Sequence, residues 1–288
     1  MFHKLLPALK TSCQRACLPL FMMGTLLYSG CTSDKNGDRV LFPIENDLEL
    51  GNQVSQQVDS AYRAKGQLLD RNSRDPKIRA AYAHLDKIVA RLLESGQVSY
   101  RDEFPWDVKI INDREVQNAF ATPGGHIYVF TGLIKFLDSE DQLAGVLGHE
   151  IAHADQRHSI KQLQKQYGIS FISRLVLGEN AGQLERIIGG AAGQYLGLKF
   201  SRDYEREADD YSVLYLGATE YYACDGAAGF FQKMQTLQNN GQIPEFFSTH
   251  PAPANRIQEI QNQARQRGCK TATASNTGYQ EFKRNLGL

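Results

Sequence analysis

The chain has 288 residues, with 32 basic and 32 acidic side chains, so its formal net charge at pH 7 is zero. This balance predicts no nucleic-acid partner and no affinity for acidic polymers, because both require an excess of positive charge. Hydrophobic residues make up 42% of the sequence, which is enough for a domain with a sizeable core.

The first 30 residues have the pattern of a bacterial secretory signal. Three positive charges, Lys4, Lys10 and Arg15, precede the uncharged and mostly apolar stretch 16–30. This stretch is short for a membrane-spanning helix and has the length of a signal-peptide core. We therefore predict that residues 1–30 are a signal peptide and that the protein is secreted across the inner membrane.

Cys31 follows the small residues Ser29 and Gly30, so cleavage before it would resemble lipoprotein processing. Tyr28 departs from that pattern, in which leucine is usual. We predict lipidation of Cys31 and, through it, attachment to a membrane from the periplasmic side. Thr32 follows the cysteine where aspartate would favour inner-membrane retention, and by analogy this favours the outer membrane.

The remaining chain is predicted to fold as a tether, one domain and a short tail. Residues 31–44 are the tether, 45–270 the domain and 271–288 the tail. A break at Asp75-Pro76 divides a helical region at 45–94 into two helices, because a proline disfavours helical geometry at the residue before it.

Two strands and a series of helices are expected after this region. The strands are 106–111 and 125–130, the second entered by a Pro-Gly-Gly turn. The expected helices are 139–165, 168–178, 181–199, 201–217, 225–240 and 253–267. The fold class is therefore α+β and mainly helical.

Residues 149–153 read His-Glu-Ile-Ala-His and carry the most chemistry of any segment. On a helix His149 and His153 share one face, about 5–6 Å apart at Cβ, so both can bind one zinc ion. Glu150 lies close enough to act as a general base without being a ligand. The alternative is an amphipathic helix with solvated histidines, but the segment is mostly apolar and Asp138 or Ser139 can cap it.

A catalytic zinc site needs a third protein ligand, and Glu205 is the predicted one. Asp209 lies one helical turn later on the same face and can accept a hydrogen bond from a ligating histidine. Glu207 is about 200° round the helix from Glu205 and is expected to point away. The alternative for this segment is a charged, solvated helix face.

Cys224 and Cys269 remain after the N-terminal cysteines are assigned to the signal and the lipid. In an oxidising compartment they can form a disulfide, or they can stay as two buried thiols. The segment 168–198 has no uninterrupted run long enough to span a membrane. It is expected to be a core helical hairpin, with a mobile lid over the cleft as the alternative.

Four segments together resemble the gluzincin metallopeptidases, which include the CAAX prenyl endopeptidases, the heat-shock protease HtpX and soluble periplasmic relatives. They are 118–134, the zinc pentapeptide with the following Arg157-His158, 201–209, and Ser248-Thr-His-Pro with Arg256-Ile257. They occur in the family's order and spacing. The resemblance implies a zincin-like domain with a small sheet beside the zinc helix and one zinc ion per chain.

The resemblance also implies roles for residues that spacing alone would leave in loops. His250 would stabilise the oxyanion or, in a resting state, occupy the open metal position and keep the enzyme latent. Arg256 would polarise the scissile carbonyl or brace its loop. An edge strand at 125–130 would hold an extended peptide. His126 and His158 are expected to be structural.

These observations predict a zinc-dependent metalloendopeptidase that acts on polypeptide substrates, with protein quality control in the cell envelope as the expected setting. Two alternatives stay open. One is a polypeptide-binding chaperone or assembly factor with a latent zinc site. The other is a structural zinc protein with a closed site of four ligands, although Glu150 has no purpose in such a site.

Overall fold

The computed structural model describes residues 40–179, 182, 199–219, 221–241, 245–251, 255–271 and 277–288. The expected signal peptide, Cys31, residues 31–39 of the tether and residues 183–198 of the expected hairpin lie outside the described residues. None of the described helices combines the length and apolar character needed to cross a bilayer.

Two long helices, α1 (Glu45–Ala64) and α2 (Pro76–Leu93), precede the sheet. The break falls where the sequence predicts it. The Asp75 side chain accepts a hydrogen bond from the amide of Lys77 at 2.8 Å, and Pro76 takes the first helical position. The expected apolar face of α2 is buried, and it consists of Tyr82, Leu85, Ile88, Val89 and Leu92.

A three-stranded sheet forms the wall beside the central helix. It consists of β1 (Val108–Ile111), β2 (Ala119–Ala121) and β3 (Ile127–Phe130) in the order β1-β3-β2. β1 pairs with β3 in parallel, with Lys109 opposite Tyr128. β2 pairs with β3 in the antiparallel sense, with Phe120 opposite Tyr128.

The expectation that residues 125–130 form an edge strand is wrong. β3 fills the centre of the sheet, and all four of its residues are buried. The short strand β2, which was not predicted from the sequence, is the edge strand nearest the central helix. The 3-10 turn Pro123–Gly125 joins β2 to β3, and Gly124 takes a left-handed φ of 73° there.

The central helix α4 (Glu140–Asp155) carries the zinc pentapeptide. Its N-cap is Ser139, whose hydroxyl accepts a hydrogen bond from the amide of Gln142 at 3.2 Å. The single helix expected at 139–165 is two helices, because Arg157 adopts a left-handed φ of 59° before α5 (His158–Tyr167).

Three further segments complete this part of the fold. They are α3 (Thr131–Phe136), which follows the sheet, the short α6 (Ile169–Val176), which follows α5, and α1, to which Arg157 is tied. The Arg157 guanidinium donates to the buried carboxylate of Asp47 at 3.1 Å. This ion pair holds the break between α4 and α5 against the start of α1.

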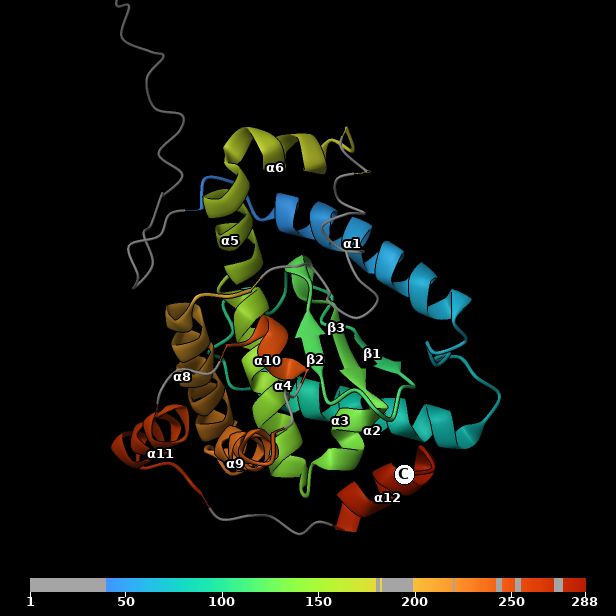
Figure 1. The fold of residues 1–288 in the computed structure, drawn as a ribbon, viewed down its shortest axis with the longest axis vertical. Helices are drawn as coiled ribbons and strands as arrows, with labels where there is room; N and C mark the ends of the chain where they lie inside the picture. Colours follow the sequence, from blue (N-terminus) through green and yellow to red (C-terminus); the bar gives the residue numbers. More distant parts are fainter. Residues whose placement is uncertain are drawn as a thin grey trace, which may run out of the picture.

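Two helices cover the side of α4 opposite the sheet, α8 (Arg202–Thr219) and α9 (Gly226–Asn239) (Figure 1). α9 approaches closely because residue 145 is glycine. A Cβ added at Gly145 would lie 2.2 Å from the amide nitrogen of Ala227. Helix α4 is therefore enclosed between the sheet and two helices, and nearly all of its residues are buried.

Three further helices end the chain, α10 (Phe246–Thr249), α11 (Arg256–Arg267) and α12 (Thr277–Asn285). The residues 277–288 of the expected tail contain α12, which docks on α2 and α3. Tyr279 donates its hydroxyl hydrogen to the carbonyl of Ile134 at 2.7 Å, and its ring is fully buried.

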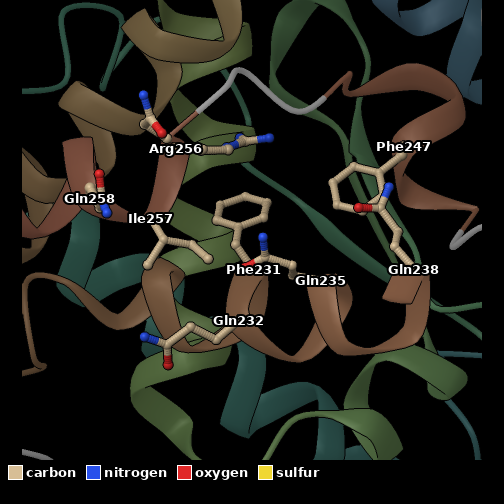
Figure 2. A pocket seen from close by; sticks show the side chains of 9 residues that line it. Phe231, Gln232, Gln235, Gln238, Phe247, Arg256, Ile257 and Gln258 are labelled. Carbon is tan, nitrogen blue, oxygen red and sulfur yellow. The ribbon is translucent and has the colours of Figure 1, made fainter. Parts of the chain in front are cut away.

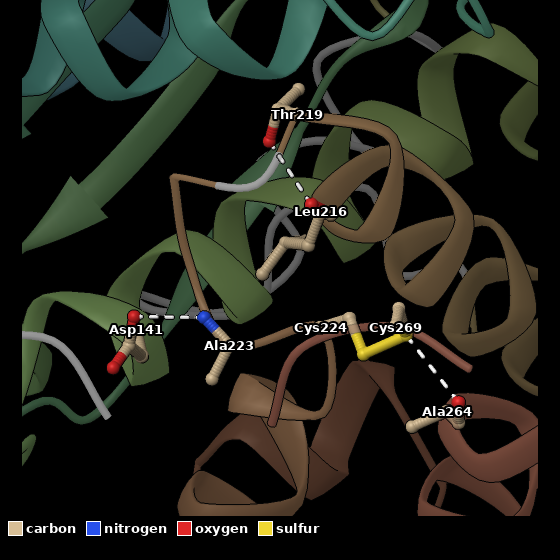
Figure 3. Close-up of a disulfide and its surroundings, with 7 residues drawn as sticks. All are labelled: Asp141, Leu216, Thr219, Ala223, Cys224, Ala264 and Cys269. Atoms are coloured by element: carbon tan, nitrogen blue, oxygen red, sulfur yellow. Dashed lines mark hydrogen bonds between the residues drawn. A yellow bond between two sulfur atoms is a disulfide. The ribbon is translucent and has the colours of Figure 1, made fainter. Parts of the chain in front are cut away.

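The predicted disulfide between Cys224 and Cys269 is present in the structure (Figure 3). It ties the segment before α9 to the end of α11. Next to it the amide of Cys224 donates to the carbonyl of Lys270 at 2.8 Å. The bridge packs on Gly217 of α8, where an added Cβ would lie 3.0 Å from that of Cys269. It therefore fixes α11 against α8, the two helices that carry Arg256 and Glu205.

Candidate metal centre

Helix α4 places His149, Glu150 and His153 in the interior of the molecule. The two imidazoles lie one turn apart on one face, and their Nε2 atoms are 3.0 Å from each other. All three side chains are at most 1% exposed. Two histidines this close and this deeply buried require a shared partner, because unpaired buried polar groups are costly.

Two more donors meet the histidines from distant segments. Glu205, in the first turn of α8, lies with Oε1 3.4 Å from Nε2 of His153. His250, just after α10, places Nδ1 3.1 Å from the same Oε1 and 3.4 Å from Nε2 of His149. The four side chains form one buried cluster of potential metal ligands.

The spacing of this cluster fits a tetrahedral zinc ion. Bonds of about 2.0–2.1 Å place the ligand atoms roughly 3.3–3.4 Å from one another. With one atom from each residue (Nε2 of His149 and His153, Nδ1 of His250 and Oε1 of Glu205), four of the separations lie between 3.0 and 3.4 Å. Three imidazoles and one carboxylate also make a donor set that suits zinc.

Unpaired buried atoms point to the same site. Among the described residues, Oε1 of Glu150 and Nε2 of His250 have no hydrogen-bond partner. They lie 3.6 Å apart beside the cluster, and both side chains are 1% exposed. The residues present therefore fit a metal site with a catalytic carboxylate next to it.

Asp209 lies behind His149, on the side away from the cluster. Its Oδ1 lies 2.9 Å from Nδ1 of His149, and Arg256 binds the same carboxylate at 2.6 and 2.8 Å. Burial alone would raise the pKa of Asp209, but Arg256 and His149 outweigh it and lower the pKa below its ordinary value. An ionised Asp209 holds His149 with Nε2 directed at the cluster.

Arg256 lies inside this network. Its side chain is 3% exposed, and Nη1 is 3.2 Å from Oε2 of Glu205. The guanidinium carbon lies 3.6 Å from the centre of the Phe231 ring. Of the two roles expected for Arg256, this geometry matches bracing, since the guanidinium is engaged by the carboxylates of Glu205 and Asp209.

Electrostatics divide the two glutamates into different roles. Burial raises the pKa of Glu150, which suits a carboxylate that must accept and then release a proton. Burial would also raise the pKa of Glu205, but His250, His149 and His153 hold it well below its ordinary value. Glu205 therefore stays ionised, as a ligand must.

The two histidines of α4 also differ from each other. Burial alone would lower the pKa of His149, but hydrogen bonds to Asp209 and Glu205 raise it to about 9. Burial holds the pKa of His153 well below its ordinary value. The difference follows the group behind each imidazole, which is the carboxylate of Asp209 for His149 and the imidazole of His158 for His153.

Sequence reasoning missed two residues behind His153. His158, expected to be only structural, has Nδ1 2.9 Å from Nδ1 of His153. Glu207, expected to point away, lies 3.3 Å from Nε2 of His158. The break at Arg157 turns His158 back toward the cluster, and a continuous helix could not have indicated this contact. His126 pairs instead with Asp107, away from the metal cluster.

A pocket of about 340 Å³ lies next to the cluster, between α9, α10 and α11 (Figure 2). Phe231 and Arg256 line it and also contact the metal-site residues. The other lining residues are mostly amides and apolar side chains: Gln232, Gln235, Gln238, Phe247, Asn255, Ile257 and Gln258. The pocket therefore meets the Asp209–Arg256 pair through the Arg256 side chain.

The sequence of this chain is similar to those of known proteins. The profile of peptidase family M48 matches residues 79–264, which include all four cluster residues. The chain is 31% identical over 65% of its length to the mitochondrial metalloendopeptidase OMA1 of Schizosaccharomyces pombe, of which 54% is covered.

Two other similar proteins come from a plant and a bacterium. The chain is 30% identical over 69% of its length to the mitochondrial metalloendopeptidase OMA1 of Arabidopsis thaliana. It is 28% identical over 64% of its length to the beta-barrel assembly-enhancing protease of Escherichia coli. It covers 38% and 39% of these two relatives, so it spans only part of their length. The family match over more than half of this chain shows that the chain belongs to peptidase family M48.

Proposed function

We propose that this protein is a zinc-dependent metalloendopeptidase that hydrolyses peptide bonds in polypeptide substrates, with its peptidase domain at residues 45–270. The observation that carries the proposal is the buried cluster of His149, His153, Glu205 and His250, with Glu150 held beside it. Family membership and the names of the similar proteins support it.

In this proposal His149, His153 and Glu205 hold the zinc ion. The ion would supply Lewis acidity toward the scissile carbonyl and the attacking water. Glu150 accepts the proton of that water at Oε1, because its Oε2 is already engaged by the amide of Ala121 at 3.1 Å. Glu150 then passes the proton to the leaving amine.

Asp209 and Arg256 keep the ligand set in place. Asp209 accepts from Nδ1 of His149, which leaves Nε2 of that imidazole for the metal. Arg256 balances the charge of Asp209 and Glu205 and braces the start of α11. The distance from Arg256 to both carboxylates is short enough that its loss would leave two buried anions without a counter-charge.

We assign His250 to the fourth position of the metal in a resting state. Its Nδ1 lies within 3.4 Å of two ligand atoms, where a substrate carbonyl or water would otherwise bind. Phe246 stacks on the imidazole with ring centres 4.4 Å apart, and the amide of His250 donates to the carbonyl of Phe246. Movement of this short segment would open the site to water and substrate.

The same closed cluster favours a second candidate, a polypeptide-binding chaperone or assembly factor in which the zinc site stays latent. The substitution Glu150→Gln separates the two functions. A chaperone keeps its biological function when this residue is changed, whereas a peptidase loses it.

We further propose that the protein acts in the cell envelope, on misfolded or unassembled proteins. A disulfide at Cys224–Cys269 suits an oxidising compartment, and the signal-like residues 1–30 and Cys31 suit export and lipid attachment. The name of the E. coli relative, a beta-barrel assembly-enhancing protease, supports a role connected with protein assembly.

Cleavage of casein by zinc-loaded residues 31–288 tests the peptidase. We expect activity that disappears on chelation, returns with zinc and requires Glu150. If all three proteins (the wild type, Glu150→Gln and His250→Ala) bind one zinc ion and none of them cleaves casein, the result contradicts a general peptidase and favours the chaperone.

A further inference from the structure

His153 and His149 are supported in different ways on the side away from the metal cluster. His149 meets the carboxylate of Asp209 directly. His153 meets a second imidazole, that of His158, with the two Nδ1 atoms 2.9 Å apart. Nε2 of His158 in turn lies 3.3 Å from Oε2 of Glu207. His158 is fully buried and Glu207 is 7% exposed, so this chain of contacts lies inside the protein.

A metal ion bound at the cluster would fix the protons along this chain. Nε2 of His153 faces the cluster, 3.0 Å from Nε2 of His149, and must be free of a proton to bind a metal. The proton of His153 is then on Nδ1, which donates to Nδ1 of His158. A neutral His158 carries its own proton on Nε2, which donates to Glu207.

We propose that His158 and Glu207 are positioning residues for His153, and that they fix its tautomer and ring orientation for zinc. This inference rests on the zinc site of the proposed function. We call the contacts from His153 through His158 to Glu207 the relay. The relay is the counterpart of Asp209 behind His149, with one imidazole inserted between the ligand and the carboxylate.

The geometry of α8 explains why an imidazole is needed there. Glu205 and Asp209 lie about one turn apart and face α4, whereas Glu207 lies about 200° from Glu205. The carboxylate of Glu207 therefore approaches from the α5 side, where His158 begins the helix after the break. His158 spans the remaining distance.

Stacked aromatic rings hold both imidazoles of the relay in their planes. Tyr204 stacks on His158 with ring centres 4.6 Å apart, and Phe200 stacks on His153 at 4.1 Å. Packing and hydrogen bonding could each account for the position of His153. Two substitutions at His158 separate them.

His158→Phe keeps an aromatic ring against Tyr204 but has no acceptor for His153. His158→Asn loses the ring but can place an amide oxygen near the former Nδ1. The zinc dissociation constant is measured by competition with a chromogenic chelator, together with the melting temperature of the metal-free protein. We expect His158→Phe to weaken zinc binding about 10–100-fold, the range seen when the support of a ligand is lost, and His158→Asn to weaken it less.

The pair His84–Glu140 supplies a matched control. It is another histidine–carboxylate contact, at 3.1 Å, and His84 stacks on Phe282 as His158 stacks on Tyr204. It belongs to α2 and the first turn of α4, outside the metal cluster. His84→Phe should leave the zinc dissociation constant unchanged, whereas Glu207→Gln should raise it.

The order of affinities decides the outcome. Tighter zinc binding by His158→Phe than by His158→Asn would overturn the relay in favour of packing. Equal losses in His158→Phe and His84→Phe would overturn it in favour of general destabilisation. If the parent binds zinc but His158→Phe binds it equally well, the relay alone fails. If the parent binds no zinc, the proposed function itself fails.

Discussion

The amide of Ala121 donates a hydrogen bond to Oε2 of Glu150 at 3.1 Å. Ala121 is the last residue of β2, the edge strand, and Glu150 is the expected general base on α4. The strand thus fixes one carboxylate oxygen and directs the other, Oε1, toward His250. One main-chain group of the sheet therefore sets the position of the catalytic carboxylate.

Glu150→Gln should remove peptidase activity and preserve zinc binding. Glutamine can still accept from the Ala121 amide but cannot take a proton, so kcat/KM should fall by at least about 10²–10⁴-fold. Casein cleavage and zinc content per chain measure the two effects. The exposed Glu94→Gln serves as a control with full activity. Residual activity within tenfold of the wild type would show that Glu150 is not the base.

His250→Ala should increase casein cleavage by the zinc-loaded protein. His250 is the fourth residue of the cluster, and a site that is open about a tenth of the time gains roughly tenfold when it is freed. Initial cleavage rates of both proteins at equal zinc loading give the comparison. A lower rate in the variant would instead assign His250 to the oxyanion.

Removal of the disulfide should destabilise the domain without altering the ligands themselves. The bridge closes a separation of 45 residues, and its loss in Cys224→Ala/Cys269→Ala should cost about 2–4 kcal/mol of unfolding free energy. Urea unfolding of the zinc-free protein measures this cost. Dithiothreitol should lower the stability of the wild type and leave the double variant unchanged; equal responses would contradict the bridge.

Glu140 should contribute stability that depends on pH. The contact with His84 and the charge of Arg91 outweigh burial and lower the pKa of Glu140 below its ordinary value of 4.5. A carboxylate whose pKa is lower in the folded state stabilises above about pH 4.5, and this stabilisation is lost as the pH falls through the folded-state pKa.

Glu140→Gln should therefore cost about 1–2 kcal/mol near pH 7 and progressively less below about pH 4.5. Urea unfolding of wild type and variant across this pH range gives the difference. A cost that does not depend on pH would mean that Glu140 acts through packing and not through its charge.

The candidate metal-site residues of α4 and α8 could be predicted because their spacing along one helix is local information. His149, His153, Glu205 and Asp209 each lie one turn from a partner of matching chemistry, and the structure brings all four together. The cap of α4 at Ser139 was also available from the sequence.

The connections between the helices and strands were harder to predict from the sequence. The left-handed residue Arg157 is not a glycine or an asparagine, so nothing local indicated that the helix would break before His158. β2 has only three residues, and its alternation is too short to stand out from a loop. Both errors hid contacts of candidate site residues, Glu150 in one case and His153 in the other.

The enclosure of the cluster has a consequence for how the metal enters and leaves. His149, His153, Glu205 and His250 are at most 1% exposed, so a chelator cannot reach an ion held between them without a prior opening of the protein. Loss of zinc should then proceed at the rate of that opening, independent of chelator concentration. Mutations that loosen the segment around His250 should accelerate metal release even where they leave affinity for the ion nearly the same.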